Sequence, residues 1–181
     1  MITLLTGGSA CGKSYYAEAS AVSAAKRLKV PLYYVATMLP YGEEGEKRIR
    51  RHREQRKSKG FLTVERYRDI GDAEFDRPGV VLLECVGNLA ANEMFEYGFD
   101  GKDVVSHTVN GITALSKKCR ELIIVTNEVG SDIQEYSGST VDYILYLGEI
   151  NRALSELSDN VLELVCGIPL VLKGKKPLEE E

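Results

Sequence analysis

A short segment near the N-terminus has the residue types and spacing needed to hold a phosphate. It matches the pattern G-x-x-x-x-G-K-S/T at every fixed position, through Gly7, Gly8, Ser9, Ala10, Cys11, Gly12, Lys13 and Ser14. The glycines let backbone N–H groups turn toward one anion, and a helix that begins directly after the loop adds its positive end. Lys13 can reach the β- and γ-phosphates, and the Ser14 hydroxyl can ligate Mg²⁺. The segment therefore predicts a nucleotide site.

Two acidic residues follow apolar segments of the kind that form buried strands. Glu84 comes directly after residues 80–83, and Glu128 follows residues 122–126. In an open α/β sheet, ligands bind beyond the carboxyl ends of the strands. Glu84 can therefore assist Mg²⁺ through water or accept hydrogen bonds from a guanine edge, and Glu128 can orient a substrate hydroxyl. The alternative for both is a solvated acid at a strand end.

A strongly basic segment contains one of the two histidines. Residues 46–57 carry seven Lys and Arg side chains against two acids, and helical spacing of four stacks Arg48, His52 and Arg56 in one column. Arginines around an imidazole favour its neutral, nucleophilic form and can hold a phosphate facing it. His52 is therefore a candidate nucleophile. An ordinary surface histidine and a helix that contacts RNA phosphates are the alternatives.

The elements that position these residues follow from the apolar pattern. We expect strands at 2–6, 31–36, 61–66, 80–83 and 122–126, and helices at 13–28, 46–59, 88–97, 104–118 and 139–157. Pro40, Gly42 and Gly45 predict a loop, and residues 161–165 and 170–172 predict a hairpin around Gly167, Ile168 and Pro169. Short apolar strands that alternate with helices predict a mostly parallel α/β sheet covered on both faces, with an antiparallel hairpin at its C-terminal end.

The composition limits the class of protein. The 181 residues suit a single nucleotide-binding domain, 1–181, in which residues 42–60 form the basic helix carrying His52. A net charge of −4 and a pI near 5.4 favour neither nucleic acid nor membrane as a partner. No apolar run is long enough for a membrane span, and the first residues lack the basic region of a signal peptide. The four cysteines lack metal-ligand spacing, which indicates thiols in a reducing cytoplasm.

Several segments together resemble one known family, the bifunctional adenosylcobinamide kinase/adenosylcobinamide-phosphate guanylyltransferases of cobalamin biosynthesis. The most specific matches are the basic segment 48–53 and the stretch Thr126-Asn127-Glu128-Val129-Gly130. The phosphate loop matches too, as do residues 34–37, 82–85, 148, 151 and 167–174. The resemblance extends over nearly the whole chain.

The resemblance implies a RecA-like P-loop NTPase fold and two reactions. A nucleoside triphosphate, ATP or GTP, phosphorylates the aminopropanol hydroxyl of adenosylcobinamide, and GTP then transfers GMP to that phosphate through a GMP-histidine, which corresponds to His52 here. Mg²⁺ would be held by Ser14 and Glu84. Family members form trimers. The nucleotide contacts of the family map onto residues 7–14 and onto Val35, Ala36, Thr37, Arg53, Glu54, Gln55, Arg56, Glu65 and Glu84.

The sequence also departs from the family pattern. Arg51 stands where a second histidine is frequent, Ile144 and Leu145 replace a usual Arg-Asp pair, and Arg152 replaces a frequent Gln. These differences fall on the segments expected to serve the corrinoid, the kinase step or the subunit interface. Two other functions stay open: a P-loop small-molecule kinase without guanylyltransferase activity, and a non-catalytic nucleotide switch with an RNA-contacting basic helix.

Overall fold

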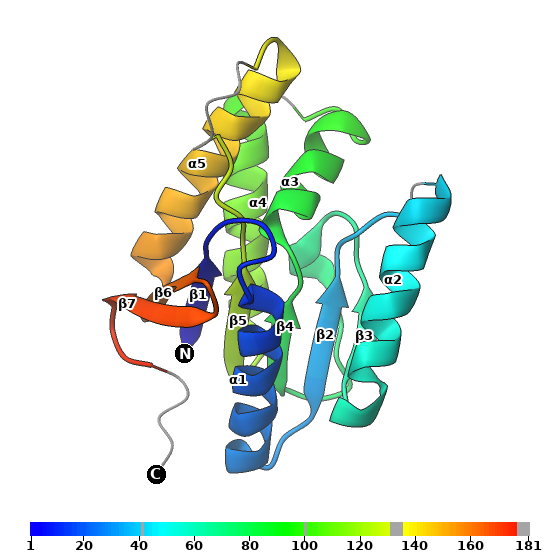
Figure 1. Ribbon diagram of the computed structural model, residues 1–181, viewed down its shortest axis with the longest axis vertical. Helices are drawn as coiled ribbons and strands as arrows, with labels where there is room; N and C mark the ends of the chain where they lie inside the picture. Colours follow the sequence, from blue (N-terminus) through cyan, green and yellow to red (C-terminus); the bar gives the residue numbers. More distant parts are fainter. Residues whose placement is uncertain (41, 100, 131–135, 177–181) are drawn as a thin grey trace.

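The computed structural model describes residues 1–40, 42–99, 101–130 and 136–176, and these form one seven-stranded sheet (Figure 1). Its strand order is β3-β2-β4-β5-β1-β6-β7; β7 runs antiparallel to β6, and the other neighbouring strands are parallel. This confirms the predicted mostly parallel α/β sheet with a C-terminal antiparallel hairpin. The strands are β1 Ile2–Thr6, β2 Leu32–Ala36, β3 Leu62–Glu65, β4 Val80–Leu83, β5 Glu121–Val125, β6 Asn160–Val165 and β7 Ile168–Lys173.

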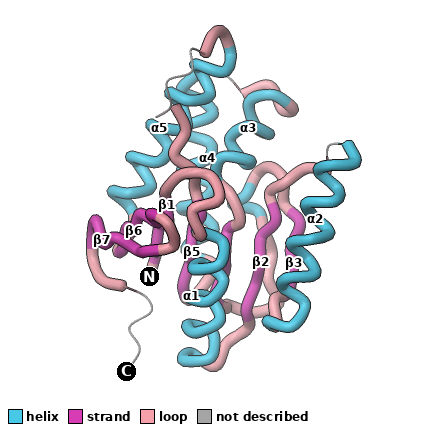
Figure 2. The backbone as a smooth tube through the Cα atoms, viewed as in Figure 1, coloured by secondary structure: helices cyan, strands magenta, loops and turns pink. Residues whose placement is uncertain are grey.

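Helices cover both faces of the sheet (Figure 2). On one face α1 packs on side chains such as Leu5, Tyr34 and Leu82, and on the other face α3, α4 and α5 pack on their strand neighbours, such as Leu4 and Val35. Because both faces are buried at the centre of the sheet, the strands there are apolar at successive positions instead of alternating, as in β4 and β5. The helices are α1 Lys13–Leu28, α2 Gly42–Arg56, α3 Val86–Phe95, α4 Gly101–Lys117 and α5 Ser139–Leu157, with single 3₁₀ turns η1 Lys57–Lys59 and η2 Ile70–Asp72.

Helix α1 has the bounds predicted from its apolar spacing. Its sheet-facing positions are small, among them Ala17, Ala21 and Ala24, so the helix lies close to the strands beneath it. It ends at Lys29, which takes the left-handed conformation (φ 55°), two residues before Pro31. This short, closely packed helix fixes the loop that precedes it against the carboxyl end of β1.

The loop predicted at Gly42 and Gly45 is wrong, because both residues belong to α2. Two ion pairs with i,i+4 spacing, Glu43 with Lys47 and Glu46 with Arg50, support the first turns, and the acidic side chains there suit the positive end of the helix. The predicted helix 46–59 therefore starts earlier, and it ends at Arg56, followed by η1 and Gly60 at φ 79°.

Further boundaries differ from expectation, and the helix expected at 104–118 spans Gly101–Lys117. The helix expected at 88–97 begins at Val86, because the Cys85 sulfur caps it by accepting a hydrogen bond from the Asn88 N–H at 3.4 Å. The C-terminal hairpin turns at Cys166 and Gly167, so Ile168 and Pro169 lie within β7. Proline is tolerated there because β7 is the edge strand. Across the described ranges, no helix combines the length and apolarity needed to cross a membrane.

Candidate nucleotide site

The loop between β1 and α1 adopts a conformation that its glycines permit. Gly7 has φ 133°, and a Cβ added there would lie 2.6 Å from the Leu164 carbonyl oxygen, so only glycine fits. Gly12 has φ 99° and directly precedes α1. The loop thus meets the helix N-terminus at the carboxyl end of β1 (Figure 1), which is the arrangement that binds phosphate.

Lys13 is held against this loop by backbone oxygens. Its side chain is buried, with the residue only 6% exposed, and its Nζ donates to the carbonyl oxygens of Gly7 at 2.8 Å and Gly8 at 2.6 Å. These bonds satisfy an ammonium group that would otherwise be costly to bury. They hold the Lys13 ammonium against the loop at the N-terminus of α1.

A cleft of about 510 Å³ opens beside the loop at the carboxyl edge of the sheet. Loop residues 9–14 form one wall, and Glu84, Asn127 and Glu128 contribute from beyond β4 and β5. The two strand-end acids singled out from the sequence therefore lie in the same cleft as the phosphate loop. The Glu128 N–H also donates to the Gly7 carbonyl oxygen at 3.2 Å, which ties the segment after β5 to the loop.

Glu84 is oriented by the segment after β2. The Thr37 N–H donates to Glu84 Oε2 at 3.1 Å, and the Thr37 hydroxyl donates to the Cys85 carbonyl at 2.9 Å. Asn92 donates to the Thr37 carbonyl at 2.8 Å. Thr37 and Val35 are themselves fully buried, so they support the cleft instead of facing it.

The donor set of the cleft fits Mg²⁺. Ser14 and Glu84 both line it, and hydroxyl and carboxylate oxygens are ligands that this ion accepts. Among the described residues, no group of three or more His, Cys, Asp and Glu side chains could hold a metal by itself. An ion here would therefore be shared with nucleotide phosphates and water, as Mg²⁺ commonly is.

Helix α2 brings a buried arginine to the edge of the site. Arg56 is only 5% exposed, and its Cζ lies 3.4 Å from the centre of the Tyr34 ring. Its Nε and Nη1 atoms have no hydrogen-bond partner among the described residues. A buried cation with unused donors is a ready contact for an anionic group. Burial, reinforced by the Glu84 carboxylate, raises the pKa of Tyr34 far above its ordinary value, so the ring under the guanidinium stays a neutral phenol.

The other α2 candidates differ in their surroundings. Arg53 pairs with Glu65, which also accepts a hydrogen bond from the Tyr67 hydroxyl at 2.9 Å. Arg53, Arg56 and Glu65 line a small cavity together with Ala36 and Glu84. Glu54 is exposed and accepts from Lys57 Nζ at 2.6 Å. His52 and Gln55 belong to α2, but their side chains lie outside the described part of the structure.

A network of amides holds the loop after β5, and sequence reasoning gave it no role. The Thr126 hydroxyl donates to Asn151 Oδ1 at 2.6 Å, and Asn151 Nδ2 donates to the Asn127 carbonyl at 3.1 Å. Asn92 has a similar supporting role, because its side-chain amide donates hydrogen bonds to both the Thr37 and the Tyr67 carbonyl oxygens. The available signal was a polar side chain at a position that helical spacing predicts to be buried.

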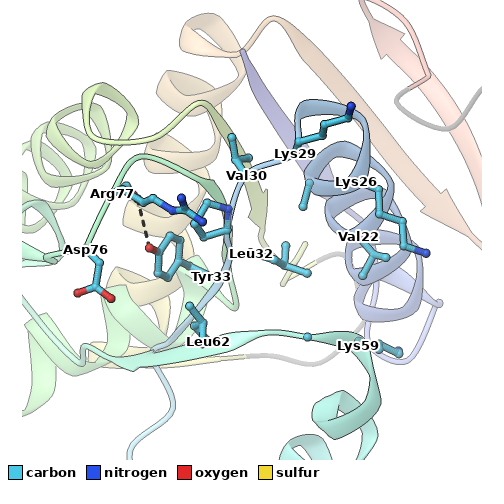
Figure 3. Close-up of a pocket in the computed structure, with 13 residues that line it drawn as sticks. Val22, Lys26, Lys29, Val30, Leu32, Tyr33, Lys59, Leu62, Asp76 and Arg77 are labelled. Carbon is cyan, nitrogen blue, oxygen red and sulfur yellow. Dashed lines mark hydrogen bonds between the residues drawn. The ribbon is translucent and has the colours of Figure 1, made fainter.

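A second cavity, of about 550 Å³, lies near the other end of β2 (Figure 3). Leu32, Tyr33 and Leu62 line it, and the Tyr33 hydroxyl donates to the Arg77 carbonyl at 3.2 Å. The ammonium groups of Lys26 and Lys29 point away from Tyr33 and Arg77. This cavity is therefore a weaker candidate for a nucleotide site than the cleft at the phosphate loop.

Fold and site together define the class. The phosphate loop follows β1, Glu84 follows β4, and β5 lies between these two strands, which is the RecA-like order of P-loop NTPase folds. The chain is thus a P-loop α/β protein of this type. Two solved structures align with it at a TM-score of 0.49 and 13% identity, over 97% of this chain and 79% of theirs: the flagellar accessory protein FlaH from Methanocaldococcus jannaschii and a KaiC-like protein from Pyrococcus horikoshii OT3.

The comparisons also assign the chain to one family within this class. The model of the family described as CobU, cobinamide kinase / cobinamide phosphate guanyltransferase, matches residues 3–172, and the chain belongs to this family. It is 30% identical to the bifunctional adenosylcobalamin biosynthesis protein CobU of Escherichia coli K12 and 27% identical to the protein of the same name from Salmonella typhimurium LT2. Each alignment covers 96% of this chain and 100% of the relative. The resemblance deduced from the sequence is thereby confirmed.

Proposed function

We propose that this protein carries out both reactions of its family, phosphorylating adenosylcobinamide and transferring GMP from GTP to the resulting phosphate through a GMP-histidine at His52. The proposal rests on one observation: the phosphate loop, Glu84 and the helix that carries His52 meet at one edge of the sheet. Lys13, Ser14 and Glu84 share a cleft, and the helix that carries His52 reaches the same edge through Arg53 and Arg56, which line a cavity with Glu84.

In the kinase step, the aminopropanol hydroxyl oxygen attacks the γ-phosphorus of the triphosphate. The bond from that phosphorus to the β,γ-bridging oxygen breaks, a nucleoside diphosphate leaves, and the hydroxyl proton passes to a nearby carboxylate. Lys13 offsets the charge on the transferred group, and Glu128 lies in the cleft where it can orient the hydroxyl. Ser14 and Glu84 would hold Mg²⁺, which would further neutralise the phosphates when bound.

In the guanylyl step, a neutral imidazole nitrogen of His52 attacks the α-phosphorus of GTP and pyrophosphate leaves. A phosphate oxygen of adenosylcobinamide phosphate then attacks the same phosphorus. The P–N bond breaks, releasing adenosylcobinamide-GDP and regenerating the histidine. Arg56 supports this step, because its buried guanidinium lies beside Glu84 and has donors that no described residue pairs.

Labelling with GTP that is radioactive at its α-phosphate tests the histidine intermediate. In the presence of Mg²⁺, the wild-type protein should acquire acid-labile label, and His52→Ala should acquire none while still binding GTP. The chain offers a matched control, because His107 is its only other histidine. The variant His107→Gln should label like wild type.

Two results would change the assignment. Undiminished label in His52→Ala would remove that residue as nucleophile. Transfer of the γ-phosphate to adenosylcobinamide without any protein label would leave a kinase that lacks the guanylyltransferase step, the main alternative for a chain that departs from its family at Arg51, Ile144 and Leu145.

We further infer a cytoplasmic homotrimer. All four cysteines are free thiols, which suits a reducing compartment. The edge strand β7 exposes apolar side chains, including Ile168, Leu170 and Leu172, which suits burial against another subunit.

A further inference from the structure

A cavity of about 580 Å³ lies where the end of α3 meets the first turns of α4 and α5. Figure 1 places these helix ends beyond the carboxyl edge of the sheet, on the side where the phosphate loop emerges. We call it the aromatic pocket. Its walls include the large apolar side chains Met94, Phe95, Phe99 and Tyr146, together with the carboxylates Asp103 and Asp142.

The aromatic pocket combines features that distinguish a ligand site from ordinary surface. Phe95 is 53% exposed although it is a large apolar residue, and Asp103 and Asp142 are exposed beside it. Apolar side chains grouped in a hollow with a few polar groups are typical of sites for organic ligands. The pocket therefore suits a ligand with an apolar face, hydrogen-bond donors at its periphery and positive charge.

Helix α3 links the aromatic pocket to the phosphate cleft. Cys85 and Asn88 at its start line the cleft, whereas Phe95 at its end lines the pocket. Ten residues of helix span about 15 Å. Tyr143 of α5 lies along this path, since its hydroxyl donates to the Gly87 carbonyl at 3.3 Å and its ring centre is 6.3 Å from that of Phe95. The aromatic pocket and the phosphate cleft thus lie at opposite ends of α3.

We propose that the aromatic pocket is the subsite for the corrin ring, an inference that rests on the proposed function. The corrin ring is broad and apolar on its faces, its edge carries primary amides that donate hydrogen bonds, and its trivalent cobalt gives the macrocycle net positive charge. Phe95 and Tyr146 offer apolar contact, and Asp103 and Asp142 accept from amides and complement the charge. The aminopropanol arm then extends from the pocket along α3 toward the phosphate cleft.

The experiment measures equilibrium binding of adenosylcobinamide and, separately, of GTP, to four variants. Phe95→Ala and Asp142→Asn should each bind adenosylcobinamide about tenfold more weakly, which corresponds to about 1.4 kcal/mol, and bind GTP as wild type does. Leu157→Ala and Glu149→Gln are matched controls, because both residues are exposed on α5 and neither lines the pocket. They should change neither affinity.

The experiment distinguishes failure of the proposed subsite from failure of the proposed function. Unchanged corrinoid affinity in both pocket variants, with a wild type that binds it, would overturn the subsite and leave the proposed function standing. A wild type that binds GTP but no adenosylcobinamide would overturn the proposed function and the subsite with it. A change in native mass on Phe95→Ala, measured by sedimentation, would assign the pocket to a subunit interface and overturn the inference as well.

Discussion

At the scale of single residues, the site depends on charges that are buried and held in place. Lys13 is satisfied by two carbonyl oxygens, whereas Arg56 lies on Tyr34 with donors that have no partner among the described residues. Leaving donors of a buried cation unpaired costs stability. Such a cost is commonly retained where a ligand supplies the missing partners.

Replacing Arg56 by Met separates these roles, because Met keeps apolar contact with Tyr34 and removes the charge. We expect GTP to bind roughly 10- to 100-fold more weakly, as for loss of a charge-assisted hydrogen bond worth about 1.5–3 kcal/mol. The free energy of unfolding should stay the same or rise, because a buried cation with incomplete pairing is gone. Calorimetric titration with GTP and urea unfolding measure the two quantities.

Arg50→Met is the control on the same helix. Arg50 is exposed and forms a surface ion pair with Glu46 at 3.7 Å, so its loss should change both quantities little. A drop in stability of Arg56→Met with unchanged GTP affinity would mean that Arg56 serves only to pack α2 on the sheet.

At the scale of elements, the apolar pattern predicted the strands and helices of the described residues, but it gave the bounds of α2, α3 and α4 less well. Helix α1 and helix α5 have the bounds that their spacing predicts. The errors fall where tertiary contacts or side-chain pairs outweigh local signals. Gly42 and Gly45 predicted a loop, yet both residues lie in α2, whose first turns are stabilised by ion pairs. The basic helix lacked an apolar face in sequence, yet it packs on the sheet through Arg56 over Tyr34, a contact that no periodicity of apolar residues can indicate.

The site was predictable to a similar degree. The phosphate loop and the strand-end acids could be inferred because sequence order and parallel topology bring them to one edge. The support given by Thr37, Asn92 and Asn151 could not, because each makes hydrogen bonds to groups far away in sequence.

A cluster of polar side chains joins α3, α4 and the residue that caps η2, Asp69. Glu93 of α3 is fully buried and accepts from the Thr108 hydroxyl of α4 at 2.5 Å. His107 of α4 lies 3.1 Å from Asp69 and 3.6 Å from Glu93, measured from its Nε2. Burial raises the pKa of Glu93, an effect that the Thr108 hydrogen bond and His107 only partly oppose and that Asp69 reinforces.

This raised pKa gives the protein a specific pH dependence. The native state binds the Glu93 proton more tightly than the unfolded state does, so its stabilising contribution is complete below the unfolded pKa and is lost as pH rises through the folded one. Glu93→Gln keeps an acceptor for Thr108 and carries no charge. Its free energy of unfolding should exceed that of wild type at about pH 8, and the gap should narrow toward about pH 5. Denaturant unfolding across this range measures it.

The exposed Glu96, which directly follows α3, provides the comparison, and Glu96→Gln should follow wild type throughout. A Glu93→Gln protein that is less stable than wild type at high pH would show that the ionised carboxylate stabilises the native state, contrary to the burial argument.

At the scale of the whole molecule, the two edges of the sheet are unequal. Strand β3 ends one side and β7 the other (Figure 2). On β7, Ile168 is 62% exposed and its neighbours Leu170 and Leu172 are exposed too, so an apolar edge faces outward. Natural proteins normally protect such an edge with charges or cover it, because it otherwise pairs with other chains. A trimer that buries β7 satisfies this requirement.

Ile168→Glu tests whether β7 is that interface. A charge forced into a subunit contact costs several kcal/mol when it is desolvated without a partner. The variant should therefore sediment as single chains at concentrations where we expect wild type to sediment as a trimer. Leu62→Glu is the matched control, because Leu62 is 52% exposed on β3, at the opposite edge, and its substitution should leave the trimer intact. A trimeric Ile168→Glu would show that β7 is not the interface, and a monomeric wild type would contradict the proposed trimer.

The same variant tests whether one chain holds the complete guanylyl site. If it is monomeric and still labels His52 with GMP, the site is complete within one chain. If labelling is lost together with the trimer while GTP still binds, a neighbouring subunit completes the site.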